Sequence, residues 1–374
     1  MQHARTEPDP TASPDRILEV GLGFQAAKVL LSAVRLDLFT VLAERPMPYE
    51  ELRARLDLHP RSARDFLDTL VALGMLHRTG GDLTGPEGRD DTDGSDGREG
   101  SDGREGGYGT YANTPATARY LDRGQSTYIG GFLEMADSRL YEFWGTLSEA
   151  LRTGEPQNEV KKSQEGGDLF DALYGESSRV SEFQQAMTGL SARSAHALAD
   201  AFDWSGRRTV ADIGCAEGAL LTQLLRMRPH LSGIGFDLPA VAGNFHRRLE
   251  RTGLADRLSF TGGDFFTGPL PTADVLIFGH ILHDWDLPTK RMLLRKAYEA
   301  LPEGGAVIVY ESLIDDDRRE NATGLLMSLN MLIETTGGFD FTGADCRRWL
   351  AEAGFRESRV RHLAGAQAAV VGVK

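Results

Sequence analysis

Four short motifs in a fixed order constrain the fold of this chain more than any other feature of its sequence. They are VADIGCAEGALL from Val210, GFDLP from Gly235, GGDFF from Gly262 and GHILHDWD from Gly279. The first motif is typical of a buried strand, a glycine turn and a helix. Asp237 ends the next apolar run, 25 residues after Asp212, where a carboxylate can bind a ribose diol. The order therefore predicts a nucleoside cofactor at the carboxyl ends of parallel strands.

The chemistry of the glycine turn favours one class of nucleoside cofactor over another. Dinucleotide-binding enzymes use the same strand, turn and distant acid, but their turn carries the pattern G-x-G-x-x-G, which seats a pyrophosphate at a helix N-terminus. The turn of this chain is GCAEG, and Glu217 would repel a pyrophosphate. A cationic cofactor fits the turn better.

Together these motifs resemble the class I S-adenosylmethionine-dependent methyltransferases. GHILHDWD resembles the signature of the small-molecule O-methyltransferase family that includes caffeate and acetylserotonin enzymes. The resemblance extends from about Arg16 to the end of the chain. It implies S-adenosyl-L-methionine as cofactor, S-adenosyl-L-homocysteine as product and no metal. It also implies an α/β fold, in which a Rossmann-like doubly wound sheet follows an N-terminal, mostly helical winged-helix dimerisation domain.

The composition is that of a soluble enzyme, and 374 residues is the usual length of about two domains. The net charge of −14 disfavours nucleic acid and anionic membranes as partners, because both attract basic surfaces. Cys215 and Cys346 offer neither a disulfide framework nor a zinc-ligand spacing. No run approaches the ~20 apolar residues of a membrane span, and no signal-peptide pattern is present. We therefore expect a cytoplasmic protein.

The chain divides into four expected regions. They are a disordered N-terminus over 1–15, a winged-helix dimerisation domain over 16–122, a helical linker and substrate-pocket region over 123–203, and a cofactor-binding catalytic domain over 204–374. Within the second region, apolar residues at helical spacing precede an expected hairpin with strands near Leu76 and Tyr111. Between these strands, the hexapeptide SDGREG occurs twice in tandem from Ser95, and we expect 84–107 to be a disordered insertion.

A winged helix is often a DNA-binding module, and a transcriptional regulator is the remote alternative for the function of this chain. Its expected helices carry acids at Asp37, Glu50, Asp57 and Asp65, which oppose contact with phosphates. The resemblance implies instead that this region forms a homodimer.

Strands alternate with helices in the last region. We expect strands at 209–213, 233–237, 258–262, 275–279, 306–312, 360–363 and 368–373. This spacing predicts a doubly wound, mostly parallel sheet that binds its ligand at the carboxyl ends of the strands.

The resemblance and the strand ends together nominate residues for the cofactor site. They are Asp212, Gly214, Gly218, Asp237, Leu238, Gly263, Asp264, Phe265, His280 and Trp285. Asp237 is expected to bind both ribose hydroxyls, and the resemblance implies that Asp264 binds the adenine amino group while Phe265 packs on the ring. For His280, a structural role is an equally good interpretation.

His283 follows the fourth strand, and the resemblance makes it the catalytic base. An imidazole with a pKa of ~6.5 can remove the proton of a phenol whose pKa is ~10, so we expect activity to rise through the histidine range of pH. Glu311 and Asp340 are nominated to orient this imidazole, although Asp340 could equally be a loop cap. Asp284 and Asp286 are expected to cap the helix that follows.

The most favoured function is O-methylation of a phenol in a hydroxylated aromatic small molecule, as part of bacterial-type secondary metabolism. The alternative is C-methylation of the ring carbon ortho to the phenol, because loss of the phenolic proton also activates that carbon. A tyrosine-like or hydroxykynurenine-like substrate would suit this alternative. Apolar helices that the resemblance places around the pocket supply substrate candidates, with core packing as the other interpretation for each: Phe143, Trp144, Phe170, Met187, Asn330, Met331 and Thr335.

Overall fold

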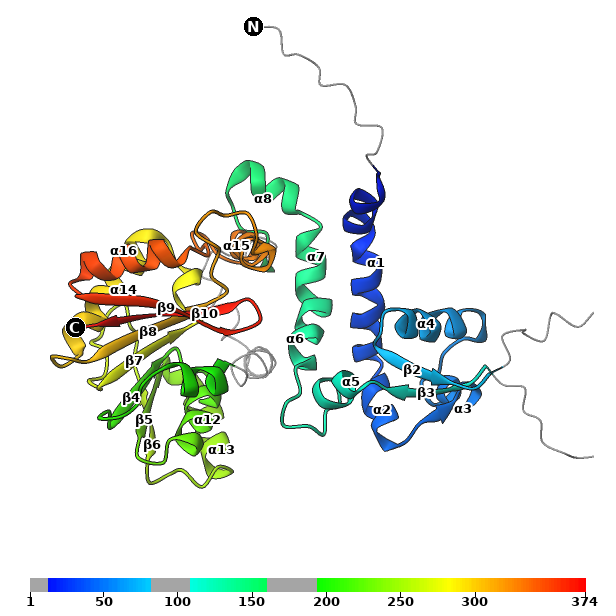
Figure 1. The fold of residues 1–374 in the computed structure, drawn as a ribbon, viewed down its shortest axis with the longest axis horizontal. Coiled ribbons are helices and arrows are strands. Elements are labelled where there is room, and N and C mark those ends of the chain that lie inside the picture. Colours follow the sequence, from blue (N-terminus) through cyan, green and yellow to red (C-terminus); the bar gives the residue numbers. More distant parts are fainter. Residues whose placement is uncertain (1–12, 82–107, 160–193) are drawn as a thin grey trace, which may run out of the picture. The chain divides into compact units, whose positions relative to one another are not determined.

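The computed structural model describes residues 13–81, 108–159 and 194–374, and the chain forms two compact units, Met1–Asp137 and Ser138–Lys374 (Figure 1). The expectations for residues 1–12, for the 84–107 insertion, and for the substrate candidates Phe170 and Met187 lie outside the described residues.

The first unit combines short helices with a three-stranded antiparallel sheet. Its helices are α1 (Asp15–Arg35), α2 (Leu38–Glu44), α3 (Tyr49–Arg55), α4 (Pro60–Ala72), α5 (Pro115–Tyr120) and α6 (Gly130–Met135). Its strands are β1 (Met47–Pro48), β2 (Leu76–Thr79) and β3 (Thr110–Asn113), in the order β1-β3-β2. Leu76 pairs with Asn113 and Arg78 with Tyr111, so the predicted hairpin is confirmed. Tyr111, Leu67 and Leu70 are fully buried in the core of this unit.

The apolar segment over 17–42 forms two helices because the chain turns at Asp37, which adopts a left-handed φ of 55°. The exposed part of α1 is apolar: Ile17 is 75% exposed, Val20 66% and Phe24 55%. By length and composition alone, α1 meets the criterion for a membrane-spanning helix, so the expectation that no such run exists is wrong. Leu31, Ala33 and Val34 near its end are nevertheless buried in the core of this unit.

The part of the expected helical linker region that follows residue 128 is divided into several pieces. The pieces are α6, a π-helical turn η2 (Ala136–Leu140), α7 (Tyr141–Trp144) and α8 (Leu147–Thr153). A π turn adds a residue to the helical repeat, and nothing in the apolar spacing of the sequence signals it.

The second unit is built on a seven-stranded sheet. Its strands are β4 (Thr209–Ile213), β5 (Ser232–Asp237), β6 (Leu258–Gly262), β7 (Val275–Gly279), β8 (Ala306–Glu311), β9 (Glu357–Ala364) and β10 (Gln367–Val373). Their order is β6-β5-β4-β7-β8-β10-β9, with β10 and β9 antiparallel to their neighbours. The predicted mostly parallel sheet is confirmed.

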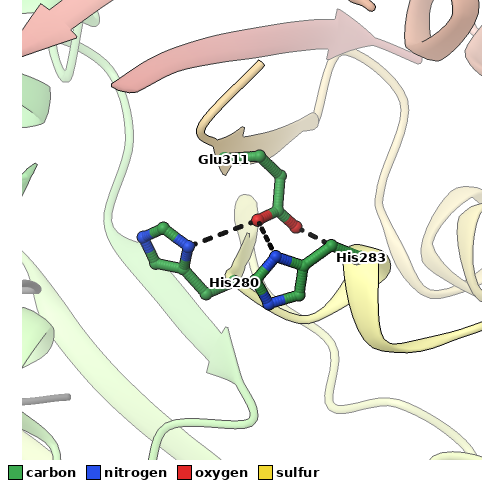
Figure 2. A group of neighbouring side chains, drawn as sticks. All are labelled: His280, His283 and Glu311. Carbon is green, nitrogen blue, oxygen red and sulfur yellow. Dashed lines mark hydrogen bonds and ion pairs between the residues drawn. The ribbon is translucent and has the colours of Figure 1, made fainter. Parts of the chain in front are cut away.

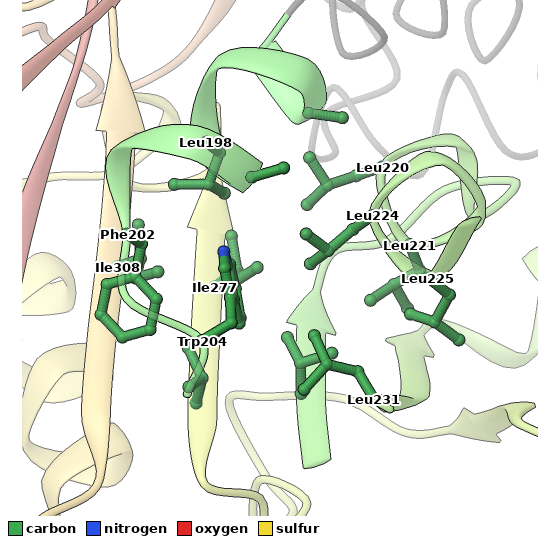
Figure 3. Close-up of a cluster of buried hydrophobic side chains, with 14 of the residues drawn as sticks. Leu198, Phe202, Trp204, Leu220, Leu221, Leu224, Leu225, Leu231, Ile277 and Ile308 are labelled. Carbon is green, nitrogen blue, oxygen red and sulfur yellow. The ribbon is translucent and has the colours of Figure 1, made fainter. Parts of the chain in front are cut away.

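Helices cover both faces of this sheet, because alternate strand residues point to opposite faces. The helices are α12 (Ala219–Met227), α13 (Ala242–Glu250), α14 (Leu287–Ala300), α15 (Ala322–Glu334) and α16 (Gly343–Ala353), with the 3-10 turns η3 (Pro239–Val241) and η4 (Leu282–Asp284). Ile277 and Ile308 pack with Leu198 and the leucines of α12 on one face (Figure 3). Leu276 and Val307 pack with α14 and α16 on the other. The core therefore fixes the strand ends that carry the polar residues.

Candidate functional site

The glycine turn after β4 is shaped by contacts that exclude side chains. Gly214 has a φ of 76°, and a Cβ atom there would lie 2.2 Å from Ile281 Cδ1. Gly218 has a φ of 78°, and a Cβ atom there would lie 2.5 Å from the ring of Phe245. Both positions therefore require glycine, and the contact with Ile281 places this turn against the segment that carries His280 and His283.

Ala216 stands in the same turn with a left-handed φ of 48°, which is unfavourable for a residue with a Cβ. Its N–H donates to Asp237 Oδ2 at 2.8 Å, and the N–H of Leu238 donates to Asp237 Oδ1 at 2.8 Å. The turn therefore holds the carboxylate of Asp237 in place, and each oxygen keeps a further lone pair for a ligand.

Two acids lie at this end of the sheet. Burial and the nearby charge of Asp237 raise the pKa of Asp212 to about 8. Burial also raises the pKa of Asp237 to about 6, although the N–H groups of Ala216 and Leu238 oppose the shift. Within the described ranges, no Lys, Arg or His contributes to the pKa of Asp212. A cationic ligand would supply the missing charge.

Glu217, the residue that argued against a pyrophosphate, forms an ion pair in which Arg248 Nη1 lies 2.6 Å from its Oε1. Arg248 is on α13, so the protein itself neutralises this acid. The buried Cys215 packs in the core cluster, as expected for a small apolar filler.

The loop after β6 carries Asp264 and two aromatic residues. Asp264 Oδ1 accepts from the N–H of Phe266 at 2.8 Å, and its Oδ2 accepts from Thr267 Oγ1 at 3.0 Å. Phe265 and Phe266 both pack edge-on against Trp285, with centroids 5.8 and 4.7 Å from its ring. Phe266 is 42% exposed, so it is not a core residue. The N–H of Gly263 donates to Asp237 O at 2.9 Å, which joins this loop to the end of β5.

The nominated catalytic residues form one buried cluster. His283 Nδ1 lies 3.3 Å from Glu311 Oε2 (Figure 2). The same nitrogen lies 3.5 Å from Asp340 Oδ1. Glu311 ends β8 and is completely buried, while Asp340 is 2% exposed. Asp340 makes no contact of the kind that caps a helix, because the N-cap of α16 is Thr342. The three residues thus come together from three separate segments.

Charge around His283 changes its expected proton affinity. Burial alone would lower the pKa of His283, but the carboxylates of Glu311, Asp284 and Asp340 together raise it to about 10. Burial also raises the pKa of Asp340, while the net effect of His283 and His280 is to lower that of Glu311. The expectation of an ordinary histidine pKa is therefore wrong, because the sequence does not show how many acids converge on one imidazole.

Asp284 and Asp286 differ in role. Asp286 is the N-cap of α14 and accepts from the N–H of Thr289 at 2.9 Å, as predicted. Asp284 does not cap the helix: its Oδ1 lies 3.5 Å from His283 Nε2, and burial raises its pKa to about 7. The second imidazole nitrogen of His283 therefore also faces an acid.

Lys290 is a member of this cluster that sequence reasoning missed. It is fully buried on α14, and its Nζ donates to Trp285 O and lies 3.6 Å from the centroid of the Phe339 ring. Burial lowers its pKa to about 8 despite the acids nearby. Its place on the buried helical stripe with Leu293, Leu294 and Ala297 is a signal that could have found it.

His280 contacts the catalytic cluster. Its Nδ1 lies 3.3 Å from Glu311 Oε2, and its Nε2 lies 3.0 Å from the side-chain nitrogen of Gln367. His280, His283 and Glu311 each bring one atom that could bind a metal ion, all within 4.8 Å of one another. The structure therefore allows two interpretations of this trio, a hydrogen-bonded group and a metal site.

The described substrate candidates lie on α7 and α15. Trp144 Nε1 donates to Asn330 Oδ1 at 2.9 Å, which ties the two helices together. Phe143 is buried against Ile333, and Met331 is 5% exposed. Thr335 Oγ1 donates to Met331 O at 2.8 Å and accepts from the N–H of Gly338 at 2.9 Å, so its hydroxyl serves the loop that leads to Asp340.

Comparison with known proteins identifies the family to which this chain belongs. Residues 18–123 match the model of the O-methyltransferase dimerisation domain, and residues 144–356 match that of the O-methyltransferase domain. The tetracenomycin polyketide synthesis 8-O-methyl transferase TcmO of Streptomyces glaucescens is 41% identical over 96% of this chain and 97% of its own. The N,N-dimethyltransferase OxyT of Streptomyces rimosus is 34% identical over 95% and 94%.

Solved structures show the same fold. The crystal structure of human N-acetylserotonin methyltransferase in complex with SAM matches with a TM-score of 0.84 and 27% identity, over 98% of this chain and 99% of that one. PigF with SAH matches with a TM-score of 0.77 and 27% identity, over 97% and 100%. The chain therefore belongs to the O-methyltransferase family with an N-terminal dimerisation domain, and it is an S-adenosylmethionine-dependent methyltransferase.

Proposed function

We propose that this enzyme methylates a phenolic oxygen of a hydroxylated aromatic small molecule in bacterial-type secondary metabolism, and that His283 accepts the phenolic proton. One observation carries the proposal: a buried imidazole at the carboxyl end of β7 has carboxylates on both of its nitrogens and lies next to the glycine turn. Two carboxylates, Glu311 and Asp340, lie at Nδ1 and one, Asp284, lies at Nε2, and we assign the acceptance of the phenolic proton to Nε2.

The residues at the glycine turn fit S-adenosylmethionine. Asp212 and Asp237 are acids with raised pKa values, which a cationic ligand would relieve, and both oxygens of Asp237 can accept ribose hydroxyls. Gly214, Gly218 and Leu238 would line the methionyl and ribose parts, and Gly263, Asp264, Phe265 and Trp285 the adenine. When bound, S-adenosylmethionine supplies the electrophilic methyl group.

The carboxylates around His283 raise its affinity for a proton, so the neutral imidazole that can accept the phenolic proton forms only as the pH approaches about 10 in the ligand-free enzyme. A pKa of about 10 matches that of an ordinary phenol, which is ~10, so a proton moves between the two groups at little cost in free energy. Once Nε2 holds that proton, Glu311 and Asp340 stabilise the imidazolium. A base in this position typically contributes about 10²- to 10⁴-fold in rate, and the rest comes from holding the reacting atoms in line.

The acceptor atom is the first point to test, because a relative as similar as OxyT bears the name of an N,N-dimethyltransferase. Purified enzyme is incubated with S-adenosylmethionine labelled with ¹³C in its methyl group and with a panel of phenols, aromatic amines and C-nucleophilic phenols. The proposal predicts a new methoxy carbon signal, far downfield of an aryl methyl. A product methylated only on carbon or only on nitrogen would contradict it.

We further propose that the enzyme is a cytoplasmic homodimer, with the exposed apolar residues of α1 in the interface. The match to the dimerisation domain and the exposed Ile17, Val20 and Phe24, spaced three and four residues apart on one helical face, support this. Light scattering should give about twice the chain mass of 40.9 kDa. Val20→Glu should shift the protein to monomer, whereas the control Glu19→Gln on the same helix should not. A monomeric wild-type protein at all concentrations would contradict the proposal.

A further inference from the structure

A line of polar contacts runs from Ser194 through Gln367 and His280 to Glu311. Ser194 Oγ donates to Gln367 Oε1, and Gln367 Nε2 lies 3.0 Å from His280 Nε2. His280 Nδ1 lies 3.3 Å from Glu311 Oε2, the same oxygen that lies 3.3 Å from His283 Nδ1 (Figure 2). One carboxylate oxygen therefore joins two imidazoles, and the mechanism above uses only one of them.

The partners of His280 decide which of its nitrogens carries the proton. An amide NH₂ group can only donate, so His280 Nε2 accepts from Gln367 and the proton of the neutral ring is on Nδ1. Nδ1–H then faces Glu311 Oε2 at the ion-pair distance of 3.3 Å. This arrangement favours a hydrogen-bonded group over a metal site, because a metal would need the lone pair of His280 Nδ1.

Three backbone features place the side chains of His280, Glu311 and Gln367 near one another. His280 follows β7 with a left-handed φ of 55°, and its N–H donates to Tyr310 O at 3.1 Å. Glu311 pairs with Ala368, and the register of β10 against β9 shifts between Gln367 and Ala368. Such a bulge redirects a side chain, here that of Gln367 beside the end of β8. A non-glycine residue in this conformation is strained, and the surrounding contacts must offset that strain.

We propose that His280 is a positioning residue for proton transfer at His283: together with Gln367, it holds the Glu311 carboxylate in the orientation that receives His283 Nδ1–H. The inference rests on the proposed role of His283 as the base, and it gives His280 a function other than binding the cofactor. Among the described residues, Glu311 on β8, Asp284 on η4 and Asp340 before α16 act on the pKa of His283, and the ring of His280 after β7 lies 5.6 Å from its ring. Lys290 on α14 interacts with the same three carboxylates.

Two substitutions at His280 separate positioning from folding. Glycine accepts a left-handed φ without strain, so His280→Gly removes the imidazole while preserving the backbone. Asparagine also tolerates this conformation, and its amide nitrogen can donate to Glu311 in place of Nδ1. We expect His280→Gly to lower kcat about tenfold, the effect of losing one hydrogen bond to a charged group. His280→Asn should recover most of that loss, and the exposed His362→Asn serves as the control.

Two further measurements test why kcat falls in His280→Gly. In His280→Gly, the Kd of S-adenosylhomocysteine by calorimetry should stay unchanged. The limb of the pH–rate profile that belongs to His283 should move to higher pH, because Glu311 then acts on His283 alone. Gln367→Leu should shift the limb in the same direction by a smaller amount, because His280 keeps its contact with Glu311 but loses the partner that fixes its tautomer.

An unchanged His283 limb in His280→Gly would overturn this inference alone, as would a weakened Kd for S-adenosylhomocysteine with the limb in place. Zn²⁺ that binds the wild-type protein stoichiometrically, raises its turnover and fails to bind His280→Gly would assign the three groups to a metal instead. A wild-type profile that lacks any limb dependent on His283 would overturn the proposed function, and this inference with it.

Discussion

The catalytic end and the cofactor end of the site differ in whether basic groups of the protein neutralise their buried carboxylates. At the catalytic end, the carboxylates of Glu311, Asp284 and Asp340 surround the imidazole of His283. The buried amino group of Lys290 is a second basic group there. At the cofactor end, the Asp212 and Asp237 carboxyl groups approach one another, and no cation among the described residues contributes to the pKa of either. The protein balances its charge at one end and leaves it unbalanced at the other.

This difference in charge balance predicts which property of the enzyme each end controls. A carboxylate cluster that already contains its cation is organised before any ligand arrives, which is what a proton acceptor with fixed tautomer and orientation requires. An acid pair without a cation raises the free energy of the ligand-free protein, and a ligand that brings positive charge relieves it. Substitutions at the catalytic end should therefore change rate, and those at the cofactor end should change binding and stability.

The largest effect that tests this division is expected for His283→Ala. Loss of the base should lower turnover by about 10²-fold or more on any accepted phenol. The Kd of S-adenosylmethionine by calorimetry should stay within about twofold, because the glycine turn is intact. The exposed His362→Asn is the control. A variant that turned over at wild-type speed would show that orientation alone drives transfer.

The next effect is expected for Asp237→Ala at the other end. Removing the carboxylate leaves the ribose hydroxyls and two N–H groups without an acceptor, so cofactor binding should weaken by about 1 to 3 kcal/mol. At saturating cofactor, the turnover should recover to near the wild-type value. Asp256→Ala, at an exposed position, controls for general loss of charge. Unchanged cofactor affinity would remove Asp237 from the site.

Glu311→Gln should act at the catalytic end with a smaller effect. The amide still contacts the imidazole but no longer stabilises the imidazolium, so turnover should fall by about tenfold, the value of one charged hydrogen bond. Removing this negative charge should also lower the pKa of His283, and the pH–rate limb should move to lower pH. A limb that moved upward would contradict the charge balance described for the cluster.

The smallest effect is a change in how stability depends on pH. The pKa of Asp212 is raised to about 8 in the folded protein, so its contribution to stability is full below its unfolded pKa of ~3.9 and is lost as pH rises through about 8. The free energy of unfolding of Asp212→Asn should therefore rise relative to that of the wild type between pH 5 and pH 8.5. Urea unfolding at several pH values measures this, with Asp256→Asn as control. A parallel pH dependence in both proteins would refute it.

The sheet and the order of its motifs could be predicted because local patterns determine them. Apolar runs such as VLIFG at 275–279 and the residues GCAEG each carry their own signal. The glycine turn, His283 and Glu311 follow strand ends, and parallel strand ends meet at one edge of a sheet. Their convergence was therefore predictable in outline.

The remaining features depend on contacts between distant segments. Asp284 and Asp286 are both plausible caps in the sequence, and only burial shows that Asp284 faces His283. The raised pKa of His283 depends on acids from three segments, and no local sequence pattern indicates that these acids meet. Gln367 contacts His280 because the register of β10 against β9 shifts at this residue. The register depends on both strands, so it cannot be predicted from the sequence of either strand alone.

The central claim is that His283 is the base and that the acids around it set its proton affinity. The most direct test is the pH dependence of kcat/KM for the wild type and for His283→Ala on the same phenol, with the ionisation of that phenol titrated separately and accounted for in both profiles. This account predicts a wild-type rate that rises toward a pKa of about 10, the value for His283 in the ligand-free enzyme, and a variant that lacks this limb. A limb centred on the ordinary histidine pKa of ~6.5, or one that survives in the variant, would contradict it.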